Sequence, residues 1–323
     1  MSLARRQILK LAAGATAAAA MPRIAAAENY PARPVRVLVG FPAGSASDIL
    51  ARLMAPWLSD KLGQQFVVEE RPGAATNIAA EAVVHASPDG YTLLLVTSTN
   101  AVNATLYQNL DFDFLADIVP AGSIDRVPYV LEVNPAVPAN TIAEFIAYAK
   151  ANPGKINMAS NGVGSGPHVA GELFKMMADV NMVHVPYAGN VYPDLIGGQV
   201  QAMFSPIPAS IGFVKSGQLR PLAVSTEKRL PVLPDLPTVG EFVPGYEASG
   251  WHGVGAPTGT PAEVIEKLDR AIAAGDADSA MKARFVELGV EAMPMTAAEF
   301  GKFVADETEK WAKVIKFAKI KPA

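Results

Sequence analysis

The sequence predicts an α/β protein of two lobes, each built around a mixed, mostly parallel sheet. Short β-branched or apolar runs alternate with amphipathic helical segments, which is the pattern of a doubly wound sheet. The chain has 323 residues, 50% of them hydrophobic, which is too much for one small core. The alternation restarts at Val127, so we expect residues 28–126 and 248–323 to form lobe 1 and residues 127–247 to form lobe 2.

The start of the chain has the pattern of an export signal. Arg5 and Arg6 form a twin-arginine pair, a mildly apolar run follows, and a run of alanines ending at Ala27 makes a small-residue cleavage site. No later stretch approaches the length of a membrane-spanning helix. We therefore expect residues 1–27 to be a twin-arginine signal peptide, cleaved near Ala27, and the mature protein to be periplasmic.

The composition argues against several kinds of partner. The full chain has a net charge of −4, and the leader contains basic but no acidic residues, so the mature chain is more acidic still. Nucleic acids and anionic membranes favour basic surfaces, so neither is an expected partner. Cysteine is absent and the four histidines show no HxxxH spacing. The sequence therefore predicts no metal site and no cofactor.

The first predicted strand, residues 35–39, leads into a loop at residues 40–48 that opens a helix with a wide apolar stripe. Ser45 and Asp48 have the spacing of a capping box. Amides further into the first turn stay unpaired at the positive end of the helix dipole, where an anion is stabilised. Two interpretations are open at this loop: an anion cradle, or an ordinary capped helix start.

A second polar loop follows the buried strand predicted at residues 91–96, which itself comes after a strand at 66–69 and a helix ending near His85. Residues 97–100 supply hydroxyls and an amide at the carboxyl end of that strand, where open α/β sheets bind ligands. They are equally suited to capping the next helix.

The richest polar loop is at residues 160–168, between a strand at 156–159 and a helix that Pro167 opens. Its three glycines allow close approach to a ligand, but their spacing is neither a dinucleotide fingerprint nor a nucleophile elbow. We interpret Ser165 as a donor to an anion. His168 is either a second donor or a packing residue.

The rest of the chain continues the alternation. We expect further strands at residues 129–133, 183–187, 199–204, 219–224 and 251–257, helices at 140–150 and from Pro261, and a proline-rich connection at 226–237. The last helix, about residues 297–317, is expected to pack on lobe 1.

Several motifs together resemble the Bug-type periplasmic solute-binding receptors of tripartite tricarboxylate transporters. They span essentially the whole mature chain: residues 30–36 (YPARPVR), 41–44 (FPAG), 71–74 (RPGA), 87–93 (SPDGYTL), 168–174 (HVAGELF), 185–187 (VPY), 197–200 (GGQV) and 236–239 (LPTV). The resemblance implies a type II, Venus-flytrap binding protein fold in which the chain crosses between lobes twice. It also implies a ligand carboxylate held by loop amides, hydroxyls and ordered water.

From the loops and the resemblance together we predict one ligand-binding set. Its members are Phe41, Ala43, Gly44, Ser45, Ser98, Thr99, Asn100, Gly164, Ser165, His168, Tyr187 and Ser205. The sequence departs from the family pattern at two of them. Ser45 stands where a second glycine is usual, and Ser205 stands where many members carry an aspartate that can meet a ligand ammonium. Without that carboxylate a desolvated amine lacks its partner, so we expect a dicarboxylate, a tricarboxylate or an aromatic carboxylate.

The leading prediction is a monomeric, non-enzymatic receptor that captures a small carboxylate and delivers it to membrane permease subunits. One alternative is an exported serine hydrolase using Ser165 and His168, although no acidic residue is evident to orient the histidine. A second alternative is a cofactor enzyme, since twin-arginine export often serves such proteins, but no cofactor motif supports it.

Overall fold

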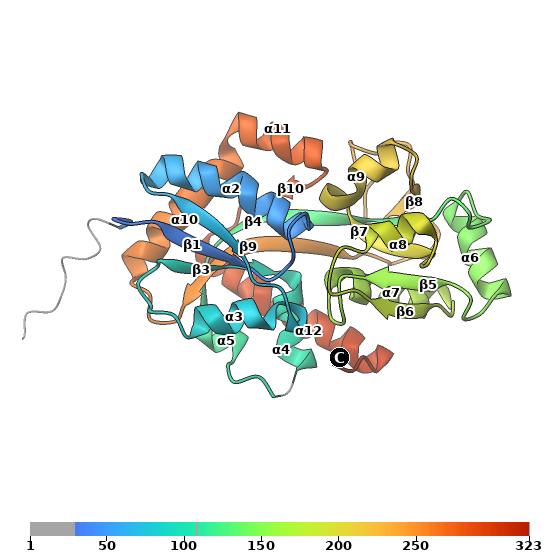
Figure 1. Cartoon of the computed structure of the whole chain (residues 1–323), viewed down its shortest axis with the longest axis horizontal. Helices are drawn as coiled ribbons and strands as arrows, with labels where there is room; N and C mark the ends of the chain where they lie inside the picture. Colours follow the sequence, from blue (N-terminus) through green and yellow to red (C-terminus); the bar gives the residue numbers. More distant parts are fainter. Residues whose placement is uncertain (1–29, 108, 323) are drawn as a thin grey trace, which may run out of the picture.

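A computed structural model describes residues 30–107 and 109–322 (Figure 1). In this part of the chain the strands are β1 Val35–Val39, β2 Phe66–Glu70, β3 Thr92–Thr97, β4 Ile118–Val133, β5 Asn157–Ser160, β6 Val183–Pro186, β7 Ala202–Pro206, β8 Arg220–Val224, β9 Ser249–Pro257 and β10 Glu291–Ala292. The α-helices are α2 Ala46–Leu62, α3 Asn77–Val84, α4 Ser98–Leu106, α5 Phe114–Asp117, α6 Ile142–Ala151, α7 Gly166–Ala178, α8 Tyr192–Gly197, α9 Ile207–Lys215, α10 Ala262–Ala277, α11 Ser279–Leu288 and α12 Ala297–Ala318. Short 3₁₀ turns lie at Ala74–Thr76 and Val239–Glu241.

The strands form one continuous mixed sheet in the order β2-β1-β3-β9-β4-β7-β5-β6, with β8 and β10 also paired to β4. Strands β1, β2 and β3 are parallel to one another, as are β5, β6 and β7. The long strands β4 and β9 run antiparallel to their neighbours and connect the two parallel groups (Figure 1). This is the predicted two-lobe α/β fold. The exact lobe boundaries stay a prediction.

Strand β4 is much longer than the strand expected from the sequence at residues 129–133. Its first part pairs with β9 from Ile118 to Pro128, and its last part pairs with β7 and β8. Pro120, Gly122 and Asp125 interrupt the apolar pattern of the first part, and the register shifts beside them. Such bulged strands lack the regular alternation by which a strand is recognised.

The last helix, α12, packs on elements of predicted lobe 1, as expected, and also on elements of predicted lobe 2, which was not expected. Phe300 and Val304 in its first half join the core cluster of β3 and α3. Trp311 and Ile315 in its second half belong to the cluster that contains Phe174 of α7, and α12 contacts both α4 and α7. Its apolar stripe runs the full length of the helix, so both halves need a covered surface.

Among the described residues, none of the helices combines the length and the apolar character that crossing a lipid bilayer requires. The predicted signal peptide, residues 1–27, lies outside the described residues.

Candidate ligand-binding site

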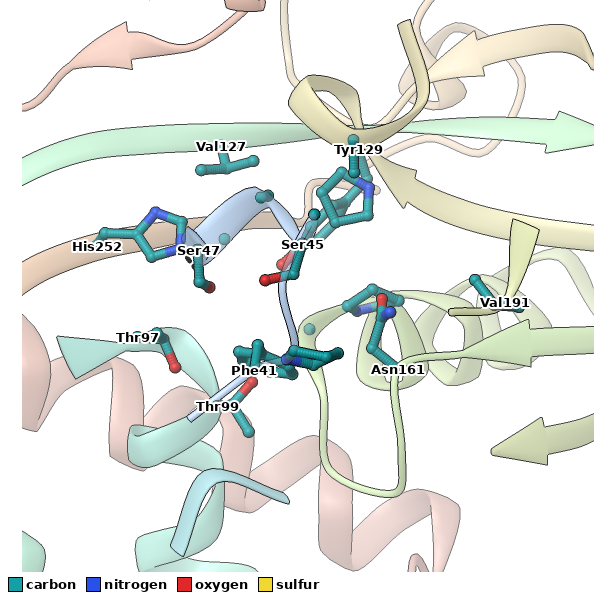
Figure 2. Close-up of a pocket in the computed structure, with 18 of the residues that line it drawn as sticks. Phe41, Ser45, Ser47, Thr97, Thr99, Val127, Tyr129, Asn161, Val191 and His252 are labelled. Carbon is teal, nitrogen blue, oxygen red and sulfur yellow. Dashed lines mark hydrogen bonds between the residues drawn. The ribbon is translucent and has the colours of Figure 1, made fainter. Parts of the chain in front are cut away.

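A cleft of about 910 Å³, counted with its open mouth, lies where the ends of several strands meet (Figure 2). Its lining comprises Phe41 to Ser47, Thr97 to Thr99, Asn161, Gly166, Pro167, Gly189 to Tyr192, Pro206, Ala209, Phe213, Gly250 to His252, and Val127 and Tyr129 of β4. Loops from both parallel groups of strands therefore face one cavity.

The first loop is fixed by the start of α2. Ser45 is the N-cap, and its Oγ accepts a hydrogen bond from the Asp48 amide at 3.2 Å, as predicted. The Asp48 carboxylate does not return to the Ser45 amide as in an ordinary capping box. It accepts instead from the Gly44 amide at 2.8 Å and pairs with the Arg52 Nε at 2.7 Å. The acidic charge is thus compensated within the protein, and Gly44 is held in place.

The second loop is the first turn of α4. The Asn100 Oδ1 accepts from the Thr97 amide at 2.9 Å, and its Nδ2 donates to the Thr76 Oγ1 at 3.0 Å. Asn100 is therefore a capping residue that does not line the cleft, whereas Ser98 and Thr99 do line it. The capping interpretation is confirmed for Asn100, and a ligand-binding role for Ser98 and Thr99 stays a prediction.

The third loop reaches the cleft through Asn161, labelled in Figure 2, and through Gly166 and Pro167. Ser165 and His168 lie outside the lining. The Ser165 hydroxyl, fully buried, donates to the Gly162 carbonyl at 2.7 Å. The His168 Nδ1 accepts from the Gly164 amide at 3.0 Å.

The His168 ring is stacked on His184 with the ring centres 3.7 Å apart. Burial lowers the pKa of His168 to about 3, so the ring is neutral at physiological pH. Ser165 and His168 are each hydrogen-bonded to the loop backbone and not to each other. The serine–base contact that the Ser165/His168 hydrolase alternative requires is therefore not present.

Tyr187 and Ser205 also lie outside the lining. The Tyr187 hydroxyl donates to the Asp194 carboxylate at 2.7 Å, and Ser205 is fully buried in β7 beside Glu132. Of the predicted set, the cleft brings together Phe41, Ala43, Gly44, Ser45, Ser98 and Thr99. The others shape its loops or the core behind them: Asn100, Gly164, Ser165, His168, Tyr187 and Ser205.

Sequence reasoning missed several lining residues, notably Tyr129. Its hydroxyl lies so close to Gly166 and Gly250 that a Cβ at either position would meet it, at 1.9 Å and 2.6 Å respectively. Both glycines are therefore needed for Tyr129 to reach the cleft. A glycine that faces an aromatic residue far away in the sequence leaves no local pattern.

Ser47 and His252, also missed, lie side by side on one wall (Figure 2). The Ser47 Oγ lies 2.9 Å from the His252 Nε2, and the His252 Nδ1 lies 2.9 Å from the Asp125 Oδ1. All three side chains are buried. They come from α2, β9 and β4, so this arrangement exists only in the folded chain.

The cleft is electrostatically unusual for an anion site. Among the described residues that line it, none is Lys, Arg, Asp or Glu. Burial raises the pKa of Tyr129 and of Tyr192, so both phenols stay neutral. The polar groups are hydroxyls, amides and one imidazole, set among apolar side chains such as Phe41, Val127 and Phe213. No group of three His, Cys, Asp or Glu side chains in residues 30–107 and 109–322 is arranged to hold a metal ion.

Two lobes joined by a pair of long antiparallel strands, with an open cleft lined by loops from both parallel groups of strands, define the class: a periplasmic-type solute-binding protein. The family model described as tripartite tricarboxylate transporter family receptor matches residues 50–320. The chain belongs to this family, whose members are periplasmic solute receptors and not enzymes.

Similar proteins extend over nearly the whole chain. Protein BugT of Bordetella pertussis is 37% identical over 94% of this chain and 94% of its own length. The structure of Rpa4515 of R. palustris with adipate has a TM-score of 0.88 and 38% identity, covering 91% of this chain and all of that one. The structure of MatC from Rhodopseudomonas palustris with bound malate has a TM-score of 0.83 and 28% identity, covering 88% and 100%.

Proposed function

We propose that this protein is an extracytoplasmic receptor that captures a dicarboxylate, a tricarboxylate or an aromatic carboxylate in the cleft. It then delivers the ligand to the membrane permease subunits of a tripartite tricarboxylate-type transporter. The proposal includes export through the twin-arginine leader of residues 1–27 and action as a monomer. Relatives solved with adipate and malate support the ligand class.

The observation that carries the proposal is the convergence of helix starts. The first turns of α2, α4 and α7 all contribute to the lining, through Ala46, Ser98 and Gly166. First-turn amides have no partner within their own helix, and each helix dipole is positive at this end. Three such ends facing one cavity stabilise an anion without any cationic side chain.

The same lining argues against ligands with an ammonium group. A desolvated ammonium needs a carboxylate or several acceptors, and no described lining residue is acidic. Ser205 is fully buried, lies outside the lining and supplies no carboxylate. The ligand is therefore expected to carry carboxylates linked by an apolar or hydroxylated body.

The ligand class can be tested by thermal unfolding in the presence of small acids. Adipate, malate, citrate and benzoate form the test set, with adipamide and aspartate as the uncharged and amine-bearing controls. A ligand that binds only the native state raises the unfolding midpoint. We expect at least one carboxylate to raise the midpoint while adipamide does not. Equal shifts with adipamide, or no shift with any acid, would contradict the proposal.

Thr99→Val tests the location of the site. The change keeps the shape of the side chain and removes one hydroxyl from the lining. A hydrogen bond to a charged group contributes about 1.5–3 kcal/mol, so carboxylate affinity should fall by roughly 10-fold to 100-fold. Thr258→Val makes the same chemical change at an exposed position outside the lining and should leave affinity within about twofold. Isothermal titration of both variants makes the comparison, and equal affinities would place the ligand elsewhere.

A further inference from the structure

The Ser47, His252 and Asp125 side chains form a buried hydrogen-bonded chain that opens onto the cleft. Ser47 and His252 are each 5% exposed and Asp125 is fully buried. Ser47 and His252 are 205 residues apart in sequence. Behind Asp125 lies a second buried carboxyl, Asp276 of α10.

The charges around this chain are few. Burial, with the nearby charge of Asp125, raises the pKa of Asp276 to about 8, so Asp276 is a neutral acid at physiological pH. The exposed Lys282 of α11 has the opposite effect, because its positive charge lowers the pKa of Asp276. Asp48 of α2 is already paired with Arg52. Asp125 is the acidic side chain in direct contact with the imidazole, with its Oδ1 2.9 Å from the His252 Nδ1.

Donor and acceptor roles follow from that charge. An ionised Asp125 only accepts, so the His252 Nδ1 carries a hydrogen and donates to it. In the neutral ring Nε2 is then an acceptor, and the Ser47 hydroxyl must donate to it. Ser47 thus offers the cleft only lone pairs, which repel a carboxylate.

Adding one proton reverses these roles. With both ring nitrogens protonated, Nε2 donates to the Ser47 oxygen, and the hydroxyl hydrogen is free to turn toward the cleft. The ring also gains a positive charge, in a lining whose described residues include neither Lys nor Arg. A bound ligand carboxylate would add a second negative charge close to Asp125. One proton on His252 would add a positive charge that offsets it.

We propose that Ser47 and His252 form a carboxylate subsite that is completed by uptake of one proton on ligand binding. The inference rests on the proposed carboxylate function and adds to it a pH dependence of affinity. The proton comes from solvent, and no covalent bond changes. By linkage, affinity should fall by up to tenfold for each pH unit in the range where the free protein has lost this proton.

Calorimetry of the wild-type protein tests this without any variant. Adipate, or malate if adipate gives no thermal shift, is titrated at the same pH in phosphate and in Tris, which differ in ionisation enthalpy. The difference in observed heat gives the number of protons taken up per ligand. We expect a value near one at alkaline pH that falls as the pH is lowered, since the free protein then already carries the proton. Binding with no proton uptake at any pH would overturn the inference and leave the proposed function intact. Absence of carboxylate binding would overturn both.

Variants assign the proton to His252. His252→Gln retains a donor toward Ser47 but cannot become charged, so its affinity should be independent of pH and its proton uptake near zero. His85→Gln, at an exposed histidine outside the lining, should behave as wild type. Unchanged uptake in His252→Gln would overturn the assignment. The order Ser–His–Asp is also that of a nucleophilic triad. Ester hydrolysis that disappears in Ser47→Ala would likewise overturn it.

Discussion

Replacing Trp251 with alanine should lower the free energy of unfolding by about 3–5 kcal/mol. Trp251 is 2% exposed and lies in β9 between the cleft and α12. Its ring meets Phe300 and Phe303 edge to face, with ring centres 5.6 Å and 5.4 Å apart. Its indole N–H donates to the Glu307 carboxylate at 3.2 Å. Alanine would leave a large cavity at the contact between the sheet and α12.

Two further variants separate the causes of this loss. Trp251→Phe keeps most of the ring volume and removes the N–H, while Glu307 still accepts from Trp311 at 3.0 Å. It should therefore cost only about 1 kcal/mol. Phe317→Ala removes an aromatic ring that is 67% exposed on α12 and should change stability by less than about 0.5 kcal/mol. Urea unfolding monitored by circular dichroism measures all three. A loss in Trp251→Ala no larger than in Trp251→Phe would show that ring packing is not the cause.

Stability should also fall as the pH rises from 6.5 to 8, because two buried carboxyls keep their protons in the native state. Burial raises the pKa of Glu132 to about 8 and that of Asp276 to about 8. Unfolded chains ionise these groups near pH 4, so in this interval the native state binds more protons than the unfolded state. The free energy of unfolding then decreases by up to about 1.4 kcal/mol per pH unit for each group. The decrease should level off above pH 8.

The lower limit of this interval is set by two histidines. Burial lowers the pKa of His168 to about 3 and that of His184 to about 4. Unfolding below pH 6.5 therefore takes up protons at these rings, which opposes the effect of the carboxyls.

Variants at the two carboxyls test this assignment. Glu132→Gln and Asp276→Asn should each remove part of the slope between pH 6.5 and 8, and Glu263→Gln at an exposed site should not. Denaturant titrations at half-unit pH steps give the slopes, and an undiminished slope in both carboxyl variants would refute the assignment.

The sequence predicted best what depends on neighbouring residues. The Ser45 cap and the alternation of strands and helices follow from local spacing, and the structure contains both. The three polar loops that contribute to the cleft lining were located for the same reason. Which side chains of a loop face the cleft depends on individual hydrogen bonds, such as that from the Ser165 hydroxyl to the Gly162 carbonyl, and these have no signature in the sequence.

What the sequence could not predict depends on contacts between distant segments. Strand β9 lies between β3 and β4 through antiparallel pairing, and this brings His252 opposite both Thr97 and Asp125. This pairing of strands also places His252 within hydrogen-bond distance of Ser47. The full length of β4 was missed because bulges at Pro120 and Asp125 interrupt its pattern. In both cases tertiary pairing outweighs local propensity.

Helix α12 has a mechanical consequence for the cleft. It packs against α4 and against α7. These two helices carry two of the three helix starts that line the cleft. A rotation of α4 relative to α7 would therefore change at least one of the two contacts of this helix. The same helix also supports the wall of the cleft, because Trp251 of the lining packs on Phe300 and Phe303 and donates to Glu307, so cleft opening and the packing of α12 would be coupled.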